Sequence, residues 1–171
     1  MSNNINFKPV YSLFMIDDGQ YRIVDGQITD GGVNENQIEW YKWAVNGINE
    51  SAGYAVPNMA FMHVGVPEYA EFEEGFIMGE RKENSCVAKV NDGFLDTFVE
   101  NGGTLMLAGH DHNNNFITEY KGIRLGYFTK SSYNCYFDFD LLGGTVLTLD
   151  KDNNVNIEIC LLYTSPSPRD L

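Results

Sequence analysis

The sequence is poor in basic side chains. Its 171 residues include 11 lysines and arginines against 24 aspartates and glutamates, which gives a formal net charge of -13. Nucleic-acid binding depends on basic groups that displace counterions from phosphates, so this balance argues against a nucleic-acid partner. It argues equally against attachment to an anionic membrane surface. We therefore expect neither nucleic acid nor a membrane among the partners.

Long apolar runs and a cysteine framework are also missing. No apolar stretch reaches the roughly 18 residues that a membrane-spanning helix needs. The first ten residues lack the basic-then-apolar order of a signal peptide. Cys86, Cys135 and Cys160 are odd in number and show no CxxC spacing. They indicate neither a disulfide framework nor a zinc ribbon, and the cellular compartment stays open.

The composition that is present is that of a globular chain with one core. Hydrophobic residues make up 43% and aromatic residues 13% of the sequence. The end of the chain differs, because residues 160–171 (CLLYTSPSPRDL) are rich in serine and proline and have no periodicity. This stretch resembles the translation of a transposase sequencing adapter; a flexible tail is the alternative. We expect residues 1–159 to form the domain and residues 160–171 to be a translated adapter tail.

Apolar periodicity predicts strands that alternate with helices. Asn34 or Asn36 is a suitable N-cap for the first helix, and Asn91 for the second.

We expect residues 67–88 to form a solvated acidic loop, and six aromatic residues near the C-terminus to pack in the core or at its edge (Tyr127, Phe128, Tyr133, Tyr136, Phe137 and Phe139). Lys121-Gly122 and residues 151–153 indicate two hairpins. The expected strands are 10–16, 21–24 as a short partner of the first, 58–64, 104–109, 116–120, 123–128, 143–150 and 154–159, with helices within 31–50 and 89–103. This order predicts an α/β domain with a mixed sheet.

The three histidines follow predicted strands. His63 comes after NMAFM, and His110 and His112 come after TLMLAG. Ligands bind beyond the carboxyl ends of strands in α/β sheets, and residues at i and i+2 of an extended segment point the same way. Asp111 would point the other way, where it could orient a ligand. Imidazole commonly binds zinc, iron and manganese, so the three histidines are candidate metal ligands. The alternative is hydrogen-bonded structural histidines beside a polar loop at residues 113–115.

Four stretches resemble one known family in the family's own order. MLAGHDHNNNF is similar to the closing Gly-His-x-His motif of the calcineurin-like metallophosphoesterases, most closely in their purple acid phosphatase-related branch. YSLFMIDDGQY, NQIEWYKWAV and MAFMHVGVPEY resemble further segments of that branch. The resemblance runs from Tyr11 to about Leu149. Two departures are Val64-Gly65-Val66 ahead of Pro67, where the branch usually has another proline, and Asn114, where aspartate is usual.

The resemblance implies a fold, a metal centre and a reaction. The fold would be the C-terminal half of a four-layer α/β/β/α sandwich with mixed sheets. His63 and His110 would share the second metal, and His112 would bind the first. The two ions would be of the iron, zinc or manganese class. The intact parent would hydrolyse a phosphate-ester substrate through attack by a metal-bound hydroxide.

The family's other metal ligands are missing from this sequence. They lie in Asp-x-His, Gly-Asp-x-x-Asp and Gly-Asn-His-Asp/Glu motifs, which the resemblance places N-terminal to the part seen here. No catalytic residue is therefore assigned to this chain, and we expect it to be inactive alone. We also expect an uncovered apolar sheet face that drives aggregation. A non-catalytic binding module and one subunit of a two-chain enzyme are the alternatives, and the partner could be the chain's own missing N-terminal half.

Overall fold

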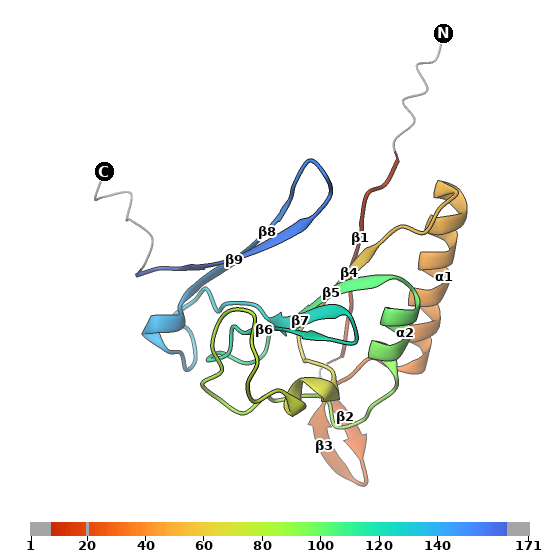
Figure 1. Ribbon diagram of the computed structural model, residues 1–171. Coiled ribbons are helices and arrows are strands. Elements are labelled where there is room, and N and C mark those ends of the chain that lie inside the picture. The colour runs from red at the N-terminus through yellow and green to blue at the C-terminus, as the bar shows by residue number, and fades with distance from the viewer. Residues whose placement is uncertain (1–7, 20, 164–171) are drawn as a thin grey trace.

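A mixed five-stranded sheet lies at the centre of this computed structural model, which describes residues 8–19 and 21–163 (Figure 1). Its strand order is β1-β4-β5-β7-β6. The first four strands in that order run parallel, and β6 is antiparallel to β7. The predicted α/β class with a mixed sheet is thus confirmed. The strands are β1 (Ser12–Met15), β4 (Asn58–Met62), β5 (Gly103–Ala108), β6 (Ile117–Tyr120) and β7 (Ile123–Tyr127).

Two helices cover one face of this sheet, α1 (Glu35–Ala52) and α2 (Phe94–Glu100) (Figure 1). Helix α1 begins at the predicted cap Asn34, whose side chain accepts from the N–H of Gln37, and it buries the Ile38, Tyr41 and Val45 stripe. Helix α2 begins at Gly93 rather than at the predicted Asn91. The Asn91 side chain instead accepts from the Gly93 N–H in a turn that precedes the helix. Asn91 thus stabilises the turn before α2 and does not cap the helix itself.

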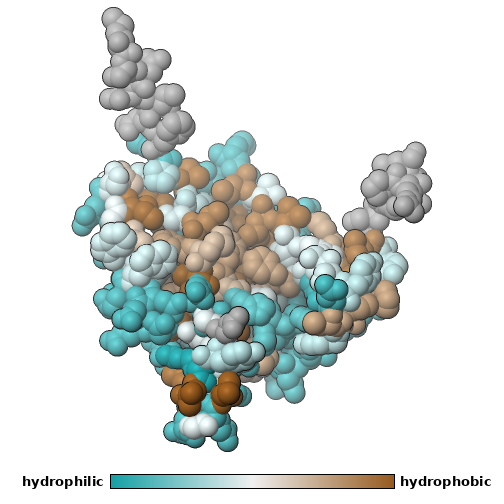
Figure 2. All heavy atoms as spheres, turned by 180° about the vertical axis from the view of Figure 1, so that it is seen from behind, coloured by the Kyte–Doolittle hydropathy of each residue, from teal (hydrophilic) through white to brown (hydrophobic). Residues whose placement is uncertain are grey.

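The opposite face of the sheet is covered only in part. Alternate strand residues such as Met59, Leu105 and Leu107 pack against the hairpin of β8 (Gly143–Leu149) and β9 (Val155–Leu161). At the β1 edge this cover ends, and the side chains of Leu13 and Met15 are 59% and 66% exposed. Seen from behind, apolar residues gather across the upper half of the molecule (Figure 2). Helices, sheet and hairpin thus form three layers, which correspond to part of the expected four-layer arrangement.

Two local expectations are wrong. Strand β2 (Tyr21–Val24) does not pair back on β1 but forms a hairpin with β3 (Gln27–Asp30), through Asp25 and Gly26 with φ of 51° and 77°. Asp-Gly is a strong hairpin signal, because both of its central positions adopt positive φ. The expected solvated loop begins with a 3-10 turn, η1 (Pro67–Glu71), in which Tyr69 is fully buried. Its hydroxyl donates to the backbone oxygen of Met106 at 2.8 Å, so this segment belongs to the core.

The C-terminal residues vary in their packing. Tyr127 is fully buried and Phe128 packs against the hairpin side of the core. Tyr133 and Phe139, near the short η2 turn (Phe139–Leu141), are more than half exposed and contact each other's rings. Strand β9 includes Cys160 and Leu161, which pair with β8, whereas residues 164–171 of the expected adapter tail lie outside the described part. Neither described helix has the length and apolar character needed to cross a bilayer.

Candidate metal centre

The candidate site lies at the carboxyl ends of three neighbouring parallel strands, β1, β4 and β5. Asp18 follows β1, His63 follows β4 and His110 follows β5. The N–H of Val64, next to His63, donates to a carboxylate oxygen of Asp18. Burial raises the pKa of the Asp18 carboxyl, while the Val64 N–H and the charge of His63 act in the opposite direction. Asp18 was not among the candidate ligands expected from the sequence, although its place beyond a strand end was a usable signal.

His63 and His110 meet at these strand ends. Nδ1 of His110 lies 3.2 Å from Nε2 of His63, and the two rings are nearly perpendicular at 84° with centroids 5.0 Å apart. Two imidazole nitrogens bound to one tetrahedral zinc ion, each at about 2.0–2.1 Å, lie about 3.4 Å apart. The spacing of the two rings therefore fits either a shared proton or a shared ion.

His112 takes a different set of partners. Its Nδ1 lies 2.8 Å from the backbone oxygen of Tyr136, and its ring stacks on the Tyr136 ring with centroids 4.3 Å apart. A carbonyl oxygen only accepts, so Nδ1 carries the proton and the Nε2 lone pair of the neutral ring is free. A histidine that ligates a metal commonly donates its other ring N–H in this way. Among the described residues, the ring contacts of His112 involve Tyr136 rather than His63 or His110.

The backbone at His110 adopts a left-handed conformation. Its φ is 71°, which is uncommon for a residue with a side chain. Before it, the N–H of Gly109 donates to the backbone oxygens of Met62 and His63, which ties the end of β5 to the end of β4. The turn thus carries the His110 ring to the position beside His63.

Asp111 and the asparagines beside it form a buried support for the loop. The Asp111 carboxylate accepts from the Cys86 N–H at 3.1 Å and from Nδ2 of Asn114 at 2.8 Å. Burial raises the pKa of Asp111, and these two hydrogen bonds oppose that effect. Asn114 and Asn115 are both 1% exposed. Asn114 and Asn115 are therefore not part of a solvated polar loop. Within the part of the chain that the structure describes, Asp111 hydrogen-bonds to Cys86 and Asn114 and not to a histidine.

Two residues that sequence analysis did not assign to the site lie beside His110. Asp30 at the end of β3 and Cys86 each offer a ligand atom within 4.8 Å of the other and of a ring nitrogen of His110. The Cys86 thiol donates to Asp30 Oδ2 at 3.2 Å. Loss of hydration, with a contribution from Asp30, raises the pKa of the Cys86 thiol to about 11. No spacing pattern joins these three residues, so the sequence offered no local signal.

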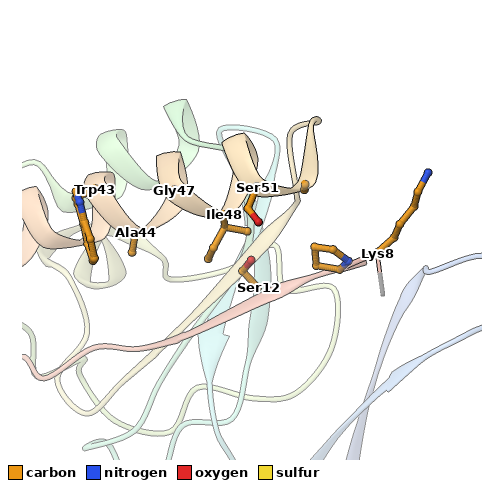
Figure 3. A pocket seen from close by; sticks show the side chains of 9 residues that line it. Lys8, Ser12, Trp43, Ala44, Gly47, Ile48 and Ser51 are labelled. Carbon is orange, nitrogen blue, oxygen red and sulfur yellow. The ribbon is translucent and has the colours of Figure 1, made fainter. Parts of the chain in front are cut away.

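A groove lies elsewhere on the molecule. It encloses about 750 Å³ between α1 and the chain that leads into β1, and Ser12, Trp43 and Ile48 line it (Figure 3). None of the histidines belongs to its lining. The groove is therefore separate from the candidate metal centre.

Three curated proteins of Arabidopsis thaliana, all named as probable inactive purple acid phosphatases, are similar to this chain. Number 14 is 30% identical over 140 residues, covering 76% of this chain and 35% of that protein. Number 28 is 31% identical over 129 residues (74% and 32%), and number 29 is 29% identical over 139 residues (75% and 36%). The chain thus spans about a third of the length of these relatives.

No family model matches the chain. A solved dimetal phosphatase from Danio rerio is similar with a TM-score of 0.42 and 17% identity, over 58% of this chain and 27% of that one.

Proposed function

This chain belongs to the purple acid phosphatase-related branch of the calcineurin-like metallophosphoesterases, and we propose that it supplies three ligands of a two-metal phosphoesterase centre. His63 and His110 hold one ion between them, and His112 holds the other through Nε2. The observation that carries this proposal is the 3.2 Å approach of the His63 and His110 nitrogens at adjacent strand ends. The Nδ1 contact of His112 with the Tyr136 carbonyl supports it, because that contact leaves Nε2 unprotonated.

The substrate class follows from the family, and the roles of the residues follow from the site. When bound, two ions of the iron, zinc or manganese class supply Lewis acidity for the hydrolysis of a phosphate ester. His63 and His110 fix the position of one ion relative to the sheet, and Tyr136 fixes the ring orientation of His112. The protein carries a net charge of -13 and so does not attract an anionic phosphate ester over its whole surface. The bound metal ions would supply the local positive charge that attracts the phosphate group.

We propose that this chain is inactive alone and that the intact parent hydrolyses phosphate esters. A closed zinc site uses about four ligands, and three histidines divided between two ions fall short of that number. The remaining ligands would come from a part of the protein that the relatives contain in their other two thirds, or from a second chain. The three Arabidopsis relatives are named as probable inactive phosphatases, which agrees with the inactivity proposed here.

A non-catalytic binding module is the second candidate. The observation that favours it is the exposed apolar side of β1, where Leu13 and Met15 face away from the helix layer. In that case the histidines would be inherited without a metal. Metal binding distinguishes the two functions, because only the first requires it.

The test is calorimetric titration of the purified chain with Zn²⁺ and Mn²⁺, alongside His63→Ala, His112→Ala and the matched surface control Lys151→Ala. We expect weak binding to the chain that His63→Ala and His112→Ala each reduce at least tenfold and that Lys151→Ala leaves unchanged. Equal binding by all four proteins would overturn the histidine assignment. Turnover of p-nitrophenyl phosphate by the chain alone, in material free of contaminating phosphatase, would overturn the proposed inactivity.

A further inference from the structure

We propose that Asp30 and Cys86 join His110 as ligands of one zinc-class ion, in a site built entirely from this chain. The proposal rests on the proposed function only through His110, which the two sites share. Three separate parts of the fold supply the ligands: the end of β3, the irregular segment before α2, and the turn after β5. Carboxylate, thiolate and imidazole are the three chemical types that zinc accepts.

The ligand atoms have the spacing that one ion requires. Those of Asp30, Cys86 and His110 all lie within 4.8 Å of one another, and Cys86 Sγ is 3.2 Å from Asp30 Oδ2. A sulfur and an oxygen bound to one tetrahedral zinc at about 2.3 and 2.0 Å are about 3.5 Å apart. Cys86 and Asp30 therefore reach this geometry with a shift of a few tenths of an ångström, and a ring nitrogen of His110 lies within 4.8 Å of both ligand atoms.

A proton now occupies the place between two of these ligands. The thiol hydrogen of Cys86 bridges to the Asp30 carboxylate. On metal binding this proton leaves to solvent, and the thiolate and carboxylate both bind the ion. One proton is released per ion bound, so no oxidant or other reactant is required.

The surrounding structure holds two of the ligands in place. The Cys86 N–H donates to the buried Asp111 carboxylate, which fixes the peptide that carries the thiol. Arg22 on β2 pairs with Asp92 ahead of α2, and this ion pair anchors the hairpin that carries Asp30. Neither contact uses a ligand side chain. Both therefore persist when the ion binds, as the supports of a metal site should.

The ligand types also define which ion fits. A thiolate with an imidazole favours zinc or cobalt over magnesium and calcium, which prefer oxygen. Three protein ligands leave a fourth position open, as in catalytic zinc sites. Nε2 of His63 lies 3.2 Å from Nδ1 of His110, so His63 neighbours this site without being one of its three ligands.

The experiment is a Co²⁺ titration of the whole chain, followed by absorbance. Thiolate ligation gives a near-ultraviolet charge-transfer band, which histidine and carboxylate ligands do not give. We expect one equivalent to produce this band, Cys86→Ser to abolish it, and Cys135→Ser, the matched control at another exposed cysteine, to retain it. Asp30→Asn should weaken Co²⁺ affinity roughly 10- to 100-fold. Near-ultraviolet circular dichroism checks that each variant is folded.

The outcomes separate this inference from the proposed function. Co²⁺ binding without the charge-transfer band would overturn the inference and leave the histidine centre standing. A band lost in Cys86→Ser but retained in His63→Ala and His112→Ala would support the inference, and the calorimetric titration of the same two histidine variants tests the histidine centre separately. A band that survives Cys86→Ser, or no binding at all, would overturn the inference.

Discussion

Nδ2 of Asn114 donates to Oδ2 of Asp111 at 2.8 Å in the interior of the loop after β5. The other end of the same amide accepts from the backbone N–H groups of Lys82 and Glu83 at 3.0 and 3.1 Å. One amide thus joins the turn that carries the histidines to the segment that carries Cys86. The branch that this sequence resembles usually has aspartate at this position, and an ionised carboxylate could not donate to Asp111 as the Asn114 amide does.

Replacement of Asn114 by aspartate should therefore destabilise the fold. The new carboxylate would face that of Asp111 in a buried position, and a hydrogen bond would be lost. We expect Asn114→Asp to lower the free energy of unfolding by roughly 2–4 kcal/mol at neutral pH. The exposed control Asn84→Asp should change it by less than about 0.5 kcal/mol. Urea unfolding of both variants measures the difference, and equal stabilities would contradict the role given to the amide.

Two glycine-to-alanine substitutions should have opposite effects. A Cβ at Gly103 would overlap the ring of Phe98, so Gly103→Ala should destabilise by about 1–3 kcal/mol. A Cβ at Gly47, within α1, meets no atom within 4 Å, so Gly47→Ala should stabilise by about 0.5–1 kcal/mol. Thermal unfolding gives the sign of each effect. A lowered melting temperature for Gly47→Ala, or an unchanged one for Gly103→Ala, would contradict the surroundings described for that glycine.

Alkaline pH should destabilise the fold through its buried tyrosines. Burial raises the pKa of Tyr41 and Tyr69 well above the ordinary tyrosine value of about 10. Above about pH 10 the unfolded chain has released these protons and the folded chain retains them, so the free energy of unfolding falls as pH rises. Tyr69→Phe should flatten this fall, whereas the exposed control Tyr21→Phe should not. Urea unfolding from about pH 8 to 11 tests this, and identical slopes in all three proteins would refute it.

The uncovered side of β1 should cause self-association. Leu13 and Met15 expose more than half of their side chains there, and exposed apolar patches promote association. Leu13→Thr combined with Met15→Thr keeps a strand-favouring residue type while removing the patch. We expect light scattering to report a smaller average mass for this variant and no change for Val146→Thr on β8. Unchanged scattering from the double variant would place the associating surface elsewhere.

Much of the fold was predictable because it is encoded locally. The Ile38, Tyr41 and Val45 spacing marks one face of a helix, and the turn at Lys121-Gly122 fixes the β6–β7 hairpin. The self-paired β2–β3 hairpin was missed even though its Asp-Gly turn was visible. Burial of Tyr69 was missed because an acidic segment does not reveal that a single aromatic side chain enters the core.

The candidate site, too, contains some residues that the sequence predicted and others that it could not. His63 and His110 were placed together because each follows an apolar strand, and parallel neighbouring strands end at one edge. Asp30 and Cys86 are 56 residues apart and meet only through tertiary packing, so no local pattern could join them. Tyr136 was expected to pack in the core or at its edge, but its ring and carbonyl orient His112.

The left-handed backbone at His110 makes a side chain at this position costly for stability. A φ of 71° disfavours a side-chain-bearing residue by about 1–2 kcal/mol, and glycine at the same position would relieve that penalty. The most stable sequence for this turn is therefore not the one present. If the site had no use, random substitution would tend to erase this imidazole early, since its loss would make the turn easier to form.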